Sequence, residues 1–79
     1  MNPDTTPATT LDARGLNCPL PILKTKKAIS DLESGDLLKV ISSDPGSVKD
    51  MHSFCQQTGH ELLDSSQDGD LYLFLICKC

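Results

Sequence analysis

Four cysteines are the residues of this 79-residue chain best suited to chemistry, and their positions give them different predicted roles. Cys55 lies among apolar residues at helical spacing, which predicts an inert core thiol. Cys77 and Cys79 form a Cys-x-Cys pair, a spacing that can hold a soft metal such as Cu(I) or Zn²⁺. Cys18 differs from these three because it directly precedes a predicted helix.

Cys18 lies within residues 15–21, GLNCPLP, at a predicted junction between a loop and a helix. Pro19 is typical of a first helical turn, where its missing N–H costs nothing, and Pro19 and Pro21 are expected to stiffen that turn. The unpaired N–H groups and the dipole of a helix N-terminus favour a thiolate, and Arg14 adds positive charge nearby. The sequence therefore predicts that Cys18 is an activated thiolate, able to accept a sulfur atom as a persulfide and pass it on.

Other uses of this cysteine find no support in the sequence. Position 21 is proline, so Cys18 has no partner at Cys-x-x-Cys spacing and a thioredoxin-like dithiol mechanism is disfavoured. His52 and His60 lie on or just past the second predicted helix, with no evident route to Cys18. A lone thiolate on so small a scaffold has no pocket or general base of its own. We therefore expect it to work with partner enzymes rather than alone.

The distribution of charge points to protein partners rather than nucleic acid. The formal net charge is −4, and the chain has three aromatic residues and no tryptophan, which disfavours a nucleic-acid binder. Residues 13–30 nevertheless contain no acidic residue and carry Arg14, Lys24, Lys26 and Lys27. This basic window surrounds Cys18 and is suited to an acidic partner.

The sequence patterns near the two ends of the chain predict the cellular compartment. Residues 1–8 are predicted to be a disordered tail, and no apolar segment typical of a signal peptide follows Met1. The longest apolar run, residues 71–77, is far shorter than the roughly 20 residues of a membrane span. We therefore expect a cytoplasmic protein with reduced thiols and no membrane partner.

Residues 9–79 are predicted to form one α/β domain. Strands are expected at residues 9–13, 37–43, 60–66 and 71–77, the last being apolar on both faces, and helices at 19–32 and 45–58. Asp44 is a predicted N-cap with Pro45 at the first helical position, and Asp68-Gly69 is a predicted two-residue hairpin turn. The order β-α-β-α-β-β suits a two-layer α/β sandwich, a mixed four-stranded sheet with both helices on one face.

The first helix has more apolar residues than its buried stripe requires. At about 100° per residue, one stripe contains Pro21, Ile22, Thr25, Ala28, Ile29 and Leu32. Leu20 and Leu23 fall outside it, beside lysines. We name Leu20, Leu23, Lys24 and Lys27 the docking face, because they could contact acidic, partly apolar partners.

The motif LNCPLP at residues 16–21, with Asp12 and Gly15 before it and Ser43-Asp44-Pro45 at the second helix, resembles the TusA (SirA-like) sulfur-carrier family. The similarity covers roughly residues 10–78. The resemblance implies the two-layer fold above. It also implies that Cys18 is the persulfide acceptor, and that no cofactor is needed beyond the covalently held sulfur.

The resemblance also implies partners. These are a sulfur donor such as a cysteine desulfurase or rhodanese, and an acceptor such as a DsrE-type transferase, bound transiently by a monomer. Leu20 stands where family members in tRNA thiolation carry an acidic residue. The segments CPLPILK and SDPGSVKD look more like members from sulfur-oxidising bacteria.

Several functions therefore stay open. We expect sulfur trafficking linked to sulfur oxidation, with tRNA 2-thiouridine formation or cofactor biosynthesis as alternatives. Two alternatives come from other classes of protein. One is a metal-binding chaperone that uses Cys77 and Cys79, and the other is a non-catalytic regulatory module that uses the basic helix.

Overall fold

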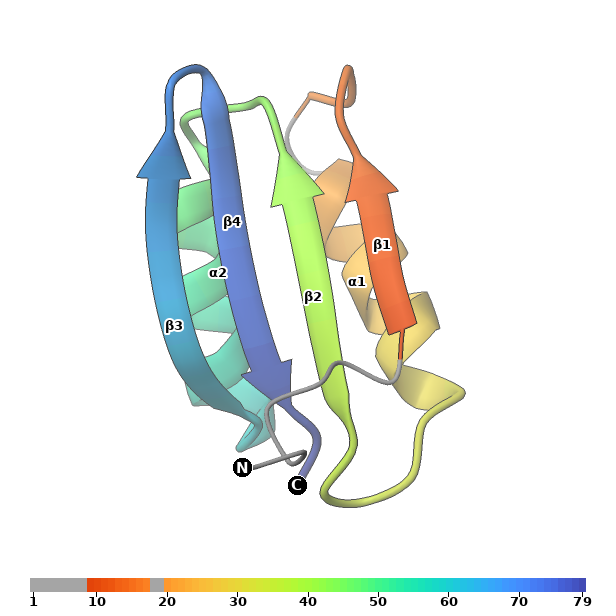
Figure 1. Cartoon of the computed structure of the whole chain (residues 1–79). Coiled ribbons are helices and arrows are strands. Elements are labelled where there is room, and N and C mark those ends of the chain that lie inside the picture. The colour runs from red at the N-terminus through yellow and green to blue at the C-terminus, as the bar shows by residue number, and fades with distance from the viewer. Residues whose placement is uncertain (1–8, 18–19) are drawn as a thin grey trace, which may run out of the picture.

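The computed structural model describes residues 9–17 and 20–79, and in it two helices pack against one face of a four-stranded sheet (Figure 1). The elements, in chain order, are β1 (Thr9–Ala13), α1 (Leu20–Ser30), β2 (Leu37–Ser42), α2 (Ser47–Thr58), β3 (Glu61–Asp68) and β4 (Leu71–Cys77). The strand order is β1-β2-β4-β3; β1 and β2 are parallel, and β4 is antiparallel to both β2 and β3. The predicted fold class is confirmed.

The core lies between the sheet and the helices. Alternate residues of the two central strands, Leu38 and Val40 of β2 and Phe74 and Ile76 of β4, are at most 1% exposed, as expected for one face of a pleated sheet. The helices add further buried side chains to the same cluster: Ile29 from α1, and Met51, Phe54 and Cys55 from α2. The predicted apolar stripes thus face the sheet. In the described part of the chain, neither helix is long and apolar enough to cross a membrane.

The start of the second helix differs from the prediction. Asp44 is not the N-cap and Pro45 is not the first helical residue, since α2 begins at Ser47 with Gly46 as its N-cap. Asp44 instead closes a tight turn before the helix: its Oδ1 accepts from the Gly46 N–H at 3.2 Å, and its carbonyl accepts from the Ser47 N–H at 3.0 Å. An Asp-Pro pair suits either arrangement.

The hairpin turn and several element ends also differ from the prediction, the ends by one or two residues. The two-residue loop is Gly69-Asp70 rather than Asp68-Gly69, because Asp68 still pairs with Leu71. Gly69 has a φ of 60°, which suits the first position of such a loop. Strand β3 therefore extends two residues beyond its predicted end. Helix α1 ends two residues earlier than predicted, at Ser30.

Candidate functional site at the junction of β1 and α1

Cys18 and Pro19 lie outside the described residues, as does the predicted tail, residues 1–8. The site is therefore built from the residues on either side. These are the loop of residues 14–17 and the first turns of α1, which begins at Leu20.

The loop before Cys18 is hydrogen-bonded to the loop that follows the neighbouring strand, β2. The Gly15 N–H donates to Ser43 Oγ, directly after β2, at 2.8 Å. Gly15 has a φ of +82°, a conformation that costs residues with a side chain about 1–2 kcal/mol. Leu16 donates its N–H to the carbonyl of Ala13 at 3.3 Å and packs against the core. These contacts position the chain just before the motif cysteine.

The first turn of α1 is anchored by Pro21 and Thr25. Both side chains are fully buried, and Thr25 Oγ1 donates to the Pro21 carbonyl at 2.8 Å. The Leu20 N–H donates to the Asn17 carbonyl at 2.8 Å, and Pro21 has no N–H. The first two positions of the helix therefore offer no free donor to an anion. Any support from backbone N–H groups has to come from the following residues.

Arg14, predicted to support the thiolate, is paired with Asp12. Its Nε and Nη2 donate to the two carboxylate oxygens, each at 2.9 Å, and its backbone N–H donates to Oδ1 at 3.1 Å. The side-chain hydrogen bonds from Arg14 lower the pKa of Asp12 to about 2, and Asp12 in turn raises the pKa of Arg14. Because the carboxylate offsets the guanidinium charge, Arg14 adds less positive potential to the loop than its residue type alone indicates.

The docking face is exposed as predicted. Its members, at positions i, i+3, i+4 and i+7 of α1, share one side of the helix. Leu20 is 45% and Leu23 is 55% exposed, and both lysines are exposed. The opposite side of α1, with Pro21, Thr25 and Ile29, is buried. The outer side of α1 thus presents two leucines and two cations beside the loop.

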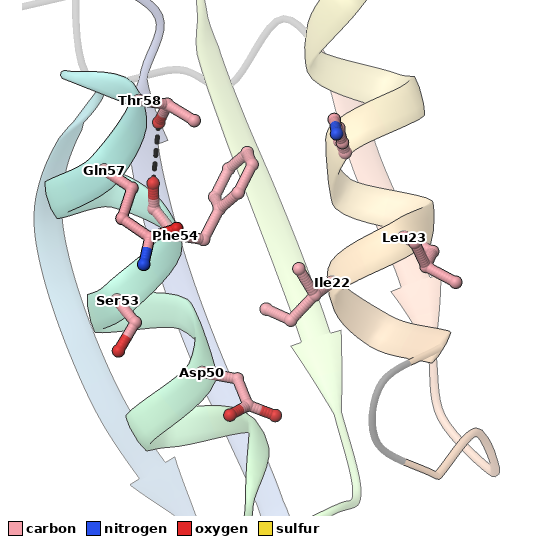
Figure 2. A pocket seen from close by; sticks show the side chains of 8 residues that line it. Ile22, Leu23, Asp50, Ser53, Phe54, Gln57 and Thr58 are labelled. Carbon is pink, nitrogen blue, oxygen red and sulfur yellow. Dashed lines mark hydrogen bonds between the residues drawn. The ribbon is translucent and has the colours of Figure 1, made fainter.

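A groove between α1 and α2, with a volume of about 400 Å³, was not predicted (Figure 2). Ile22 of α1 and Phe54 of α2 point into it from opposite sides. Ile22 belongs to the predicted buried stripe of the first helix, and helical spacing does not reveal that the two helices leave a groove beside it. The lining residues are Ile22, Leu23, Lys26, Asp50, Ser53, Phe54, Gln57 and Thr58.

The other three cysteines are free thiols distant in sequence from this junction. Cys55 is 5% exposed, which confirms the predicted core position, and burial raises the pKa of its thiol. Cys77 ends β4, and Cys79 lies past the strand, with its N–H donating to His60 Nδ1 at 3.2 Å. Among the described residues, no three His, Cys, Asp or Glu side chains are grouped to hold a metal ion.

Comparisons with known proteins agree with this fold. A SirA-like protein from Desulfitobacterium hafniense has a similar solved structure, with a TM-score of 0.77 and 25% identity, covering 87% of this chain and 95% of that one. The chain is therefore a two-layer α/β domain of the SirA-like class.

The sequence comparisons define the family. The family model for sulfurtransferase TusA matches residues 9–78. The chain is 56% identical to sulfur carrier protein TusA of Allochromatium vinosum over 68 residues, which are 86% of this chain and 90% of that protein. It is 44% identical to sulfur carrier protein TusA of Pseudomonas putida over 75 residues, 95% of this chain and 94% of that protein. The chain belongs to the TusA family of sulfur carrier proteins.

Proposed function

We propose that Cys18 carries the sulfur, as a persulfide. Its thiolate attacks the terminal sulfur of a donor persulfide, and the donor's S–S bond breaks so that the donor leaves as a thiolate. The new Cys18 persulfide is then attacked in the same way by an acceptor thiolate, which returns Cys18 to a thiolate. Sulfane sulfur is exchanged without net oxidation, so the step needs no cofactor. The observation that carries this proposal is the family match over residues 9–78, which includes the Cys-Pro-x-Pro motif.

The first turn of α1 supplies the proposed support for the thiolate. The N–H of Leu20 is already bonded and Pro21 has none, so we assign this role to the N–H groups of Ile22 and Leu23 and to the helix dipole. The first turn of α1 contains no acidic residue to oppose it. As prolines, Pro19 and Pro21 restrict the backbone dihedral angles of the motif. Arg14 contributes only a weak positive electrostatic potential, because the Asp12 carboxylate offsets its charge.

The docking face and the adjoining groove supply the proposed contacts with partners. The family is one of sulfur carriers, so both a donor and an acceptor protein must bind. We propose that they place acidic groups against Lys24 and Lys27 and an apolar side chain near Leu20 and Leu23. We propose a cysteine desulfurase or rhodanese as the donor and a DsrE-type transferase as the acceptor, in cytoplasmic sulfur trafficking linked to sulfur oxidation.

The test of the carrier residue is mass spectrometry of the intact protein after incubation with a persulfide donor. The wild type is expected to gain one sulfur atom, and peptide mapping is expected to place that atom on Cys18. Cys18→Ala should lose the adduct, whereas Cys77→Ala and Cys79→Ala should keep it. An adduct that survives in Cys18→Ala, or that maps to Cys77 or Cys79, would show that the proposal is wrong.

A further inference from the structure

Strand β4 is apolar on both faces, but the helices cover only one of them. Phe74 and Ile76 face the helices and are buried. The alternate residues Leu71, Leu73 and Leu75 point to the opposite side of the sheet and are half-buried. An antiparallel sheet with one solvated face normally alternates apolar with polar residues, so this open face has a surplus of leucine.

Two residues of opposite charge lie on either side of β4, level with Leu75. In the register of the sheet, Lys39 of β2 and Asp64 of β3 are both paired with Leu75, from its two sides. One row across the open face therefore reads cation, leucine, carboxylate. Among the described residues, no ion pair involves Lys39 or Asp64, and the ion pair that is present joins Arg14 to Asp12.

We propose that this open face binds a second copy of the chain, sheet against sheet. In a symmetric pair whose two-fold axis runs parallel to β4, the β2 of one copy lies over the β3 of its partner. Lys39 of each copy then faces Asp64 of the other, and the leucines of the two β4 strands meet along the axis. A two-fold axis across the strands would instead oppose Lys39 to Lys39 and Asp64 to Asp64. The charges therefore select the parallel arrangement.

The area of the face sets the strength of the contact. Three facing strands, β2, β4 and β3, about 4.8 Å apart and about six residues long, give a footprint of roughly 300 Å² on each copy. This is below the size of most stable interfaces, so we expect a dissociation constant on the order of 0.1 mM. A monomer, as expected from the sequence, then prevails in dilute solution.

The paired sheets leave the helical layers outside. Both helices lie on the other side of the sheet from the open face (Figure 1), so in this arrangement the docking face, the groove and the loop at residues 14–17 stay accessible. Because the two-fold axis is parallel to β4, the 14–17 loops of the two copies lie at the same end of the dimer. The proposal does not depend on the chemistry of Cys18.

Sedimentation equilibrium under reducing conditions, from about tenfold below to tenfold above the expected dissociation constant, tests the proposal. Lys39→Glu alone and Asp64→Lys alone should each weaken the dimer about tenfold, because both cross-copy pairs become repulsive. An equal mixture of the two variants should associate as the wild type does, because every pair in the mixed dimer is again attractive. Lys49→Glu, the same charge change on α2, should have no effect.

Each result decides the proposal. A wild type that stays monomeric at the highest concentration overturns it, whatever else the open face binds. A dimer unaffected by either reversal overturns the face or the parallel arrangement, and so does a mixture that fails to restore association. Amide shifts in a ¹⁵N-labelled sample should change with concentration in β2, β3 and β4, and not in α1.

Discussion

The Gly15 N–H donates to Ser43 Oγ at 2.8 Å and so joins two loops that are 28 residues apart in the sequence. One loop leads from β1 into the motif cysteine, and the other leads from β2 into α2. Because β1 and β2 are parallel, both loops leave the same end of the sheet. The hydrogen bond thus fixes the loop before Cys18 to the rigid part of the fold.

Ser43→Ala should remove that link and lower the free energy of unfolding by about 1 kcal/mol. We expect faster amide hydrogen exchange at Gly15, with the exchange in β2 changed less. Urea unfolding followed by circular dichroism and native-state exchange measure the two effects. Ser53→Ala, on the exposed side of α2, is the control and should not destabilise. Equal losses from the two variants would contradict the role given to Ser43.

Gly15→Ala should destabilise through backbone conformation alone. A Cβ at Gly15 would meet no atom within 4 Å, but its φ of +82° is unfavourable for alanine, at a cost of about 1–2 kcal/mol. Gly46→Ala is the matched control, because Gly46 has a φ of −66° and its added Cβ would meet Asp44 at an ordinary 3.6 Å. That variant should be neutral or gain up to about 1 kcal/mol in urea unfolding. A neutral Gly15→Ala would mean that the loop changes its conformation.

The Asp12–Arg14 pair should titrate at unusually low pH. The pKa of Asp12 is lowered to about 2 from an ordinary value of 3.8. A lowered folded-state pKa means that the pair stabilises the fold above pH 3.8, and that this contribution disappears as the pH falls through about 2. Carboxyl ¹³C NMR should find the midpoint of Asp12 near 2, and Arg14→Gln should raise it toward 3.8. Lys24→Gln should not move it, and a midpoint near 3.8 in the wild type would exclude the pair in solution.

Local sequence patterns predicted most of the framework. The bounds of β1 and β4 match their predictions because each apolar or β-branched run is followed by turn residues. The start of α2 was misplaced because Asp44 can cap a helix or close a turn, and the choice depends on how the chain leaves β2. A turn of this kind is decided by tertiary packing, which a local pattern does not contain.

The candidate site was predictable only in part. The exposure of Leu20 and Leu23 followed from helical spacing, and the Asp12–Arg14 pair has a spacing of two that could have been noticed at the end of a strand. The bond between Gly15 and Ser43 could not be foreseen, because it joins residues distant in sequence. The groove beside Ile22 depends on the separation of two helices, which no periodicity specifies.

Cys55 and Cys79 should differ strongly in alkylation. Cys55 is buried in the core and its pKa is raised by burial, whereas Cys79 is exposed. Because the thiolate is the reacting form, iodoacetamide near pH 8 should modify Cys79 at least about tenfold faster than Cys55. Peptide mapping over time measures both rates, with denatured protein as the control in which the difference disappears. Similar rates in the native protein would contradict the core position of Cys55.

Reversing the charge of the docking face should slow sulfur transfer without unfolding the protein. Lys24→Glu with Lys27→Glu replaces two exposed cations on α1 with anions, so an acidic partner would be repelled. We expect kcat/KM for transfer from the donor to fall by about tenfold at low salt, and the difference to shrink above roughly 0.15 M salt. The unfolding transition should change little, because exposed side chains away from packed contacts contribute little. Two reversals elsewhere, Lys49→Glu and Lys78→Glu, give the same net charge, although Lys78 Nζ bonds the Leu32 carbonyl and its variant needs its own stability measurement. If this control slows transfer equally, the net charge of the protein governs binding and the docking face has no specific role.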